Sequence, residues 1–246
     1  MKNPYVKNLN RIEFVMTYAC TGRCRHCSEG DHADCGEHID GVRAAQAVAR
    51  IAGEYPVTSV MTFGGEPLLY PEDVCRIHAA AREAGISKRQ LITNGYFSKD
   101  EERIVQVARI LAESGVNDIL LSVDAFHQET IPTEPVKTFA RAILAEGLPI
   151  RLNPAWLVDR THENPYNQRT REILEEFIAM GIPESGGNVI FPSGNAKKNF
   201  GEYFEQYGEP ENPYAEDPTD IRCVSFNPDG TTELGCFSLE SDAREV

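Results

Sequence analysis

Residues 12–27 read IEFVMTYACTGRCRHC, a short apolar run that is followed by three cysteines within eight residues. The run over residues 12–16 has the length of a buried β-strand. In parallel α/β folds, ligands bind at the loops beyond the carboxyl ends of the strands, and the cysteines lie in such a position. The stretch therefore predicts a first strand that ends in a functional loop.

The order of a short apolar run and a longer helical pattern recurs up to about residue 191. The expected strands are 12–16, 59–63, 90–93, 118–123, 150–157 and 188–191, and the expected helices are 41–54, one from about Pro71, 98–114, 134–146 and 167–180. Ser98 and Glu101 have the spacing of a capping box, and Gly115 is a typical helix stop. Strand–helix units imply parallel strands with right-handed crossovers.

Such units number six in this chain, fewer than the eight of a closed barrel. We therefore predict an α/β fold, a partial (β/α)6 barrel with an open parallel sheet, over residues 1–200. Residues 201–246 are expected to form a small C-terminal extension, because glycine, prolines and acids over 201–219 are typical of a linker. The turn signal Asn227-Pro228-Asp229-Gly230 predicts a β-hairpin within that extension.

The composition limits the cellular compartment and the kinds of binding partner that we expect. Seven cysteines are an odd number, and 246 residues are too many for a small disulfide-stapled domain. The N-terminus lacks the apolar stretch of a signal peptide and no run approaches transmembrane length, so we expect a soluble, cytoplasmic protein. The net charge of −14 makes nucleic acid or an anionic membrane an unfavourable main partner.

The three cysteines, Cys20, Cys24 and Cys27, point to a metal centre with an open position. A structural zinc site uses four ligands, and a disulfide framework uses an even number of cysteines. Three thiolates can hold three irons of a four-iron cluster, which leaves the fourth iron free. Two alternatives stay open. One is a zinc site completed by His26, His32 or His38, and the other is a thioredoxin-like pair at Cys24 and Cys27.

Further polar or glycine-rich segments follow the later strands, one after another. They are Gly64-Gly65-Glu66-Pro67, Thr93-Asn94-Gly95, Ser122-Val123-Asp124, Asn153 and Pro192-Ser193-Gly194-Asn195. Each segment alone is weak evidence, since a glycine pair is usually a turn and a strand-end Asp is often a helix cap. Because the carboxyl ends of parallel strands share one edge of a sheet, we expect these residues to meet on one rim.

The cysteine spacing C-x3-C-x2-C, with Gly64-Gly65-Glu66-Pro67 after the second strand, resembles the radical S-adenosylmethionine (SAM) enzymes over about residues 10–195. His26 occupies a position that is typically aromatic in that family. The resemblance implies that Cys20, Cys24 and Cys27 bind a [4Fe-4S] cluster whose open iron chelates SAM. One electron would then split SAM into methionine and a 5′-deoxyadenosyl radical, which abstracts a hydrogen atom from the substrate.

The resemblance also implies roles for the rim residues. Gly64, Gly65 and Glu66 would meet the methionyl ammonium, while the backbone at His26 would lie near the adenine. Ser122 and Asp124 would contact ribose hydroxyls or the methionyl carboxylate, and Asn94 and Asn153 would be further polar contacts. Arg151 would either offset the SAM carboxylate or pair with an acid on its own sheet. His127 and Gln128 either face the substrate or lie on an exposed loop.

The tail cysteines Cys223 and Cys236 resemble the SPASM and twitch extensions, which hold auxiliary iron–sulfur clusters. Only two cysteines are present there, so a second cluster would need Cys35, another side chain, an exogenous thiol or the substrate. The alternative is a pair of thiols without metal across the hairpin. Cys75, inside a helical pattern, is expected to pack as a small apolar residue.

Three functions remain open at this point. The first is hydrogen abstraction from a peptide or protein side chain, and the second is a radical SAM reaction on a small metabolite. The third is a non-catalytic metal-binding or redox module. The resemblance implies [4Fe-4S] and SAM as cofactors, and a reductant such as flavodoxin or ferredoxin as a partner.

Overall fold

The computed structural model describes residues 4–28, 30, 36–211 and 216–235 and contains one long, mostly parallel sheet. Its strands run in the order β5 (Ile150–Leu152), β4 (Asp118–Leu121), β3 (Lys88–Thr93), β2 (Ser59–Phe63), β1 (Arg11–Val15), β8 (Cys223–Phe226) and β9 (Thr232–Leu234). All neighbours in it are parallel except β8 and β9. A separate parallel pair joins β6 (Ala155–Trp156) to β7 (Asn188–Val189). The expected α/β fold with an open parallel sheet is confirmed.

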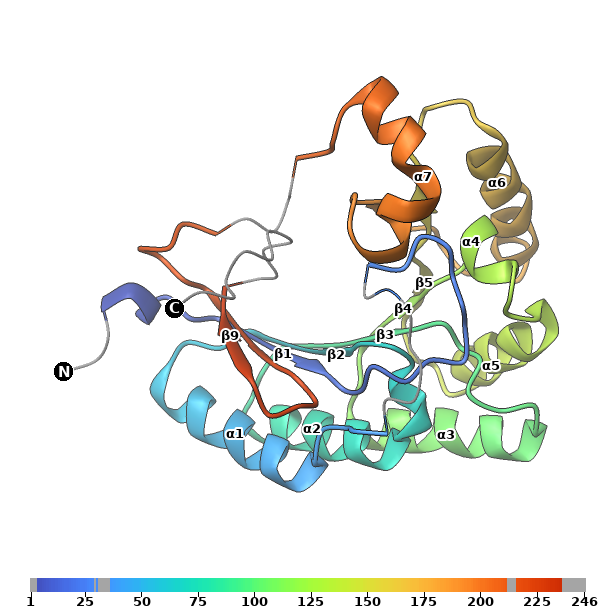
Figure 1. The fold of residues 1–246 in the computed structure, drawn as a ribbon. Helices are drawn as coiled ribbons and strands as arrows, with labels where there is room; N and C mark the ends of the chain where they lie inside the picture. The colour runs from blue at the N-terminus through green and yellow to red at the C-terminus, as the bar shows by residue number, and fades with distance from the viewer. Residues whose placement is uncertain (1–3, 29, 31–35, 212–215, 236–246) are drawn as a thin grey trace.

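Helices α1, α2 and α3, with α5 beside α3, cover one face of this sheet, and α4, α6 and α7 gather near β4 and β5 (Figure 1). α6 packs on the same hydrophobic core as α1, α2 and α3. The bounds are α1 Gly41–Glu54, α2 Pro71–Glu83, α3 Glu101–Ser114, α4 Ala125–Gln128, α5 Thr133–Ala145, α6 Pro165–Ile178 and α7 Gly194–Tyr207, with two 3-10 turns at Pro4–Val6 and Pro67–Leu69.

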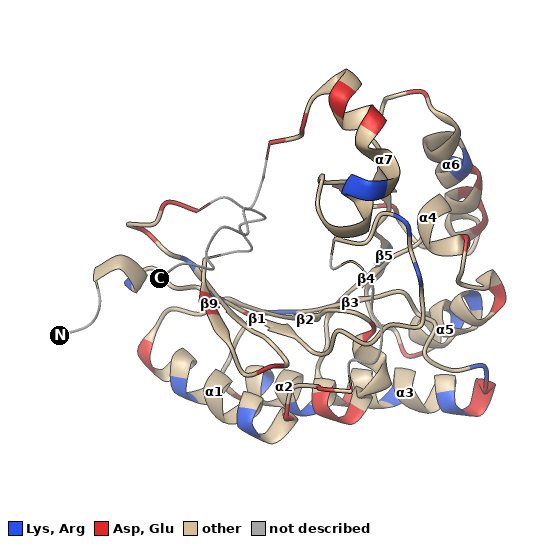
Figure 2. Cartoon of the chain, viewed as in Figure 1, with Lys and Arg blue, Asp and Glu red and all other residues tan. Residues whose placement is uncertain are grey.

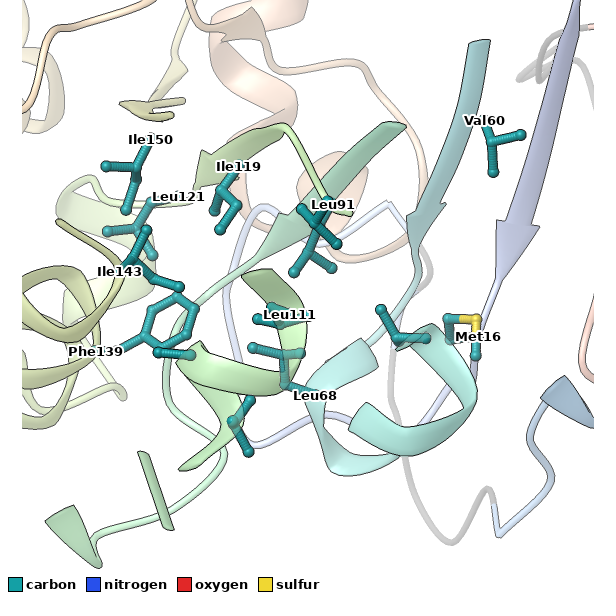
Figure 3. Close-up of a cluster of buried hydrophobic side chains, with 14 of the residues drawn as sticks. Met16, Val60, Leu68, Leu91, Leu111, Ile119, Leu121, Phe139, Ile143 and Ile150 are labelled. Atoms are coloured by element: carbon teal, nitrogen blue, oxygen red, sulfur yellow. The ribbon is translucent and has the colours of Figure 1, made fainter. Parts of the chain in front are cut away.

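The period of two along each strand separates an apolar face from a polar one. On β1, Ile12 and Phe14 belong to the main hydrophobic core, while Arg11 and Glu13 line a cavity on the opposite face. Figure 3 shows the apolar side, where strand residues meet helix residues such as Leu111 and Phe139. The helix-facing side therefore stabilises the fold, and the other side is left for function.

The helices begin and end at residues that are typical helix caps, but one predicted cap has to be corrected. α1 begins after Asp40, whose carboxylate accepts from the backbone N–H groups of Val42 and Arg43, and α3 ends at Gly115 in the left-handed conformation. The predicted capping box at Ser98 was wrong. Asp100 is the N-cap of α3, and Ser98 instead accepts from the backbone N–H of Asp100.

The expected strand 150–157 is divided in two. Leu152 ends β5, and β6 begins at Ala155, because Asn153 and Pro154 leave the main ladder. The backbone N–H of Asn153 still donates to Leu121 O over 2.8 Å, while Pro154 has no N–H and its carbonyl accepts from Asn188 over 2.8 Å. The chain thereby changes from one sheet to the other within two residues.

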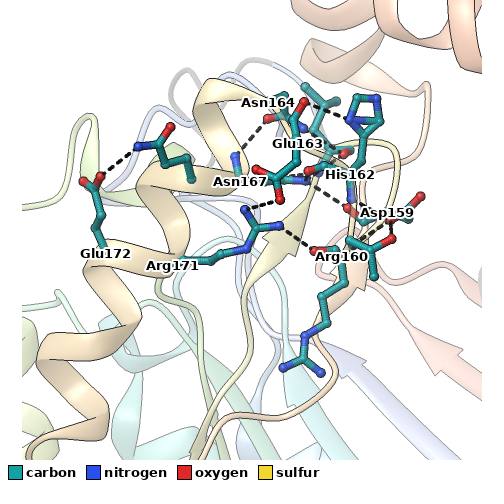
Figure 4. A network of polar contacts seen from close by, with 11 residues as sticks. Asp159, Arg160, His162, Glu163, Asn164, Asn167, Arg171 and Glu172 are labelled. Atoms are coloured by element: carbon teal, nitrogen blue, oxygen red, sulfur yellow. Dashed lines mark hydrogen bonds and ion pairs between the residues drawn. The ribbon is translucent and has the colours of Figure 1, made fainter.

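The loop after β6 is held by a compact polar network (Figure 4). The amide nitrogen of Asn167 donates to the carbonyls of Leu157, Asp159 and His162 over 2.9–3.1 Å, and its oxygen accepts from Leu157 N over 3.0 Å. Asn164 caps α6 by accepting from Asn167 N. The buried amide of Asn167 thus fixes the loop that leads into α6.

The part of the chain expected as a linker from residue 201 onward begins inside a helix. α7 runs from Gly194 to Tyr207, and its apolar residues Ala196, Phe200 and Phe204 are buried together at a spacing of four. The predicted domain boundary at residue 200 therefore lies within α7. The division into 1–200 and 201–246 stays a prediction.

The expected C-terminal hairpin is present as β8 and β9. β8 pairs in parallel with β1, in a register that sets Cys223 beside Arg11, so that the hairpin continues the main sheet. Phe14 and Phe226 stack across this junction with ring centroids 5.2 Å apart. Cys236 and Cys35, on which the hypothesis of a second cluster depends, lie outside the described residues.

The outer helices carry acidic and basic residues interspersed along their exposed sides (Figure 2). In the described part of the chain, no helix combines the length and the apolar character that crossing a membrane requires.

Candidate active site

A cavity of about 370 Å³ lies at the rim where the carboxyl ends of β1 to β4 meet β6 and β7. The residues that the resemblance implies for the cluster and for SAM line this cavity, except Glu66, Asp124 and Arg151, and the segment 192–195 that was expected on the rim does not line it. The nominated residues that line it are Cys20, Cys24, Cys27, His26, Gly64, Gly65, Asn94, Ser122 and Asn153. The predicted meeting of strand ends on one rim is thus observed.

The cysteine loop after β1 is fastened to the loop after β2 by backbone hydrogen bonds. Gly65 N donates to Thr17 O over 2.7 Å, and Glu66 N donates to Ala19 O over 2.8 Å. A Cβ atom at Gly65 would lie 2.1 Å from Ala19 O, far inside contact distance. Glycine at this position is therefore required by the cysteine loop itself, in addition to any ligand.

The three thiols lie close enough for the charge of one to affect the pKa of another. Cys24 is buried, while Cys20 and Cys27 are partly exposed. Burial, followed by the charge of Glu66, raises the pKa of Cys20 to about 11, and burial raises the pKa of Cys24 further. Metal binding would therefore release protons, because the thiolate is the ligand.

Hydrogen-bond donors are already directed at one of these sulfurs. Gly22 N lies 3.4 Å and Asn94 Nδ2 lies 3.6 Å from Cys20 Sγ. Asn94 Nδ2 also donates to Thr21 Oγ1 over 3.2 Å. Three cysteines opening on one cavity, with donors beside a sulfur, fit an iron–sulfur centre that keeps one iron accessible.

Glu66 has its carboxylate directed into the protein. It is fully buried and accepts from Leu68 N, Thr93 Oγ1 and Asn94 N over 2.7–2.9 Å. Burial raises its pKa to about 7 even though these hydrogen bonds oppose the shift. Glu66 therefore ties the end of β2 to the end of β3.

Asp124 is likewise buried, and it organises the turn after β4. Its carboxylate accepts from Phe126 N, His127 N and Ala155 N, each over 2.9 Å, and lies 2.8 Å from His127 Nδ1. Burial alone would raise the pKa of Asp124, but the charge and hydrogen bond of His127 outweigh burial and hold it well below its ordinary value. An ionised carboxylate only accepts, so His127 donates through Nδ1.

His127 and His26 both line the cavity and lie edge to face, with ring centroids 4.8 Å apart. The ring of His26 also packs on Phe126, and burial followed by the charge of His127 lowers the pKa of His26 to about 4. His26 is thus an uncharged packing residue at neutral pH. Of the two other zinc-ligand candidates, His38 stacks on Tyr70 and pairs with Asp73 over 3.5 Å, and His32 lies outside the described residues.

Arg151 forms a two-pronged ion pair with Asp118, with distances of 2.9 and 2.8 Å. Of the two readings of Arg151, this geometry favours pairing with an acid on the sheet. Arg11 and Glu13 form a second charged pair, and Ser225 Oγ donates to Glu13 over 3.2 Å. Sequence reasoning missed Arg11 and Glu13 as cavity residues, although their alternation with Ile12 and Phe14 was the available signal.

Comparison with known proteins agrees with this site. A family model described as the radical SAM superfamily matches residues 14–206. The chain belongs to the radical SAM superfamily of enzymes, whose cofactors are a [4Fe-4S] cluster and SAM.

Relatives and structural neighbours differ in what their names state. GTP 3′,8-cyclase of Moorella thermoacetica (strain ATCC 39073 / JCM 9320) is 26% identical over 163 residues, 62% of this chain and 49% of that protein. Probable GTP 3′,8-cyclase of Saccharolobus islandicus (strain L.S.2.15 / Lassen #1) is 27% identical over 209 residues, 82% of this chain and 64% of that protein. Streptococcus suis SuiB, solved with bound SAM, has a TM-score of 0.64 at 15% identity, which covers 98% of this chain and 63% of that one.

The likeness to SuiB concerns the fold. This chain spans between about half and two thirds of the length of these three proteins.

Proposed function

We propose that this chain binds a [4Fe-4S] cluster through Cys20, Cys24 and Cys27 and uses it to cleave SAM reductively for hydrogen abstraction. The observation that carries the proposal is the opening of all three cysteines on one cavity together with the strand-end rim. When bound, the cluster supplies the electron that splits SAM into methionine and a 5′-deoxyadenosyl radical. A flavodoxin or ferredoxin would be the natural electron donor.

The chain's own residues bind and orient the cofactor. Gly64 and Gly65 offer close backbone approach to the methionyl end of SAM, and Ser122, Asn94 and Asn153 offer polar groups to its hydroxyls and carboxylate. The backbone at His26 would lie near the adenine, while its ring packs on Phe126.

Glu66 and Asp124 act through other groups in this proposal. Glu66 keeps the ends of β2 and β3 together, and Asp124 orients His127. With Nδ1 directed at Asp124, Nε2 of His127 is the ring nitrogen left for a hydrogen bond to a polar group in the cavity.

The direct test is Cys24→Ala, compared with Cys75→Ala. Cys24 lines the cavity, whereas Cys75 lies in α2 and packs against the main core, as the sequence predicted. After anaerobic reconstitution and reduction, 5′-deoxyadenosine is measured by mass spectrometry. We expect Cys24→Ala to abolish it with the fold intact and Cys75→Ala to retain it. Wild-type cleavage by Cys24→Ala would overturn the assignment of the loop.

For the substrate, we propose a peptide or protein side chain. Support comes from the fold likeness to SuiB, which was also solved with its precursor peptide SuiA, with a TM-score of 0.61 and 14% identity. The second candidate is a small metabolite, favoured by the relatives named as GTP 3′,8-cyclases.

Substrate-dependent formation of 5′-deoxyadenosine separates the two candidates. We expect it to rise with candidate peptides and to stay at the basal level with GTP and other small metabolites. A rise only with small metabolites would replace the peptide proposal. Iron quantification on the same samples tests the second cluster at Cys223 and Cys236, because a second four-iron cluster would bring the content to about eight irons per chain.

A further inference from the structure

The loop that carries the third cysteine is attached to the start of α7. Asn195 N donates to the carbonyl oxygen of Cys27 over 2.9 Å. One turn further along, the side-chain amide of Asn199 donates to the carbonyl of Arg25 over 3.1 Å and to that of Asn195 over 2.9 Å. Two successive turns of α7 therefore hold two residues of the cysteine loop.

Gly194 makes this attachment sterically feasible. A Cβ atom there would lie 2.2 Å from Ser28 O and 2.7 Å from Cys27 O, and the backbone has a φ of +49°. Both oxygens belong to the backbone, so they cannot give way without moving the residue that carries the third thiol. Any side chain at position 194 would thus displace either α7 or Cys27.

α7 is also held in place by hydrophobic packing. Phe200 and Phe204 belong to a second hydrophobic cluster, separate from the main core, that also includes Phe126 and Leu157. The guanidinium of Arg25 lies 5.0 Å from the ring centroid of Phe200, and Arg25 Nη1 donates to Tyr166 Oη over 3.2 Å. A cation over aromatic rings adds a second link between the cysteine loop and this cluster.

We propose that the first two turns of α7 position Cys27 relative to Cys20 and Cys24, and that Gly194 and Asn199 are positioning residues for the iron–sulfur centre. The inference rests on the proposed binding of [4Fe-4S] by the three cysteines. The hydrogen bonds engage carbonyl groups of the loop, so they set the path of the backbone and do not involve the Cys27 sulfur. Partners of this kind, outside the ligands themselves, commonly affect metal affinity about 10–100-fold.

The test compares Gly194→Ala with Gly201→Ala, which lies in α7 just beyond a kink at Phe200, because a Cβ at Gly201 meets nothing within 4 Å. Both proteins are reconstituted anaerobically, and iron release to a chelator, the electron paramagnetic resonance spectrum and the midpoint potential of the cluster are measured. We expect Gly194→Ala to lose iron about tenfold faster and to show an altered spectrum. Gly201→Ala is expected to match the wild type.

A second pair guards against a folding defect in Gly194→Ala. Asn199→Leu removes the two amide hydrogen bonds at nearly constant volume, and Gln206→Leu makes the same kind of change at an exposed position of α7. Faster iron release and an altered spectrum are expected only for Asn199→Leu, with the melting temperatures of both metal-free variants close together.

The outcomes distinguish this inference from the function on which it rests. If the wild type takes up no [4Fe-4S] cluster, the proposed function fails. If the wild type takes it up and Asn199→Leu and a folded Gly194→Ala retain wild-type iron release, spectrum and potential, only the positioning role of α7 is overturned.

Discussion

Glu66 is a buried carboxyl group at the rim, and its protonation changes the free energy of unfolding. Its ordinary pKa is 4.5, and burial raises it to about 7 in the folded chain. Between these values the folded state holds a proton that the unfolded state has released, so this group lowers the free energy of unfolding as pH rises from 4.5 to 7. Above pH 7 its contribution is constant.

Glu66→Gln removes this dependence. In the metal-free protein, the free energy of unfolding of the wild type minus that of the variant is expected to fall by up to about 1.4 kcal/mol per pH unit between pH 4.5 and 7. The depressed pKa values of His26 and His78, about 4 and about 3, act with the opposite sign, and they cancel in the difference because both proteins carry them. Urea titrations across this range measure it.

Glu83→Gln, at the exposed end of α2, controls for the loss of one negative charge. A difference between wild type and Glu66→Gln that stays flat from pH 4.5 to 7 would show that Glu66 is ionised in the folded chain throughout this range.

His127 lines the cavity, whereas Asp124 does not line it and hydrogen-bonds to His127 Nδ1. His127→Ala is expected to raise the Kd for SAM about 3–10-fold, the loss of one hydrogen bond, while iron content stays at the wild-type level. His162→Ala, in the loop after β6, is the matched control. Unchanged SAM affinity in His127→Ala would exclude His127 as a SAM contact and leave it to the substrate.

The residue types at the strand ends were sufficient to predict most residues of the rim. The direction of each side chain could not be predicted from the sequence. Glu66 and Asp124 turn inward because their partners, Thr93 and Ala155, reach them only after the strands are in register. Local patterns carry no information about such contacts, whereas the spacing of the three cysteines is itself local.

At the scale of elements, the contact between the loops after β1 and β2 depends on the absence of a side chain at Gly65. Gly65→Ala forces a Cβ against Ala19 O, and we expect a loss of about 1–3 kcal/mol or more together with poor iron uptake. Gly53→Ala, inside α1 with open space around the new Cβ, is expected to stabilise by about 0.5–1 kcal/mol. Thermal unfolding and iron quantification compare the two.

α1 and the end of α3 followed from local signals, namely amphipathic spacing and Gly115, whereas α7 did not. Its few apolar residues are separated by polar ones and glycines, and the partners that bury them, such as Phe126 and Ile190, come from other elements. Tertiary packing decides that helix, since an isolated helix of this length is marginal in water.

The whole molecule depends on the C-terminal hairpin, because β8 completes the sheet on the free side of β1. We expect a chain that ends at Tyr207 to expose that edge and to melt about 10 °C or more below a chain that ends at Gly235, as several kcal/mol of burial are lost. Differential scanning calorimetry measures both. Equal melting temperatures would mean that the hairpin is dispensable for the fold.

The alternation of strands and helices predicted the parallel sheet up to β5, and the turn at residues 227–230 predicted the hairpin. Its place beside β1 followed from neither, because nothing local to residues 223–226 specifies a partner 212 positions away.

That pairing also sets an order of events during synthesis. β1 leaves the ribosome well before β8, because the residues of β8 that pair with it lie 212 positions further along the chain. At about 5–20 residues per second, β1 spends on the order of ten to forty seconds with one edge unpaired. During this interval the nascent chain is most prone to associate with other chains through the unpaired edge of β1. Chaperones that recognise an open strand can bind it at the same stage.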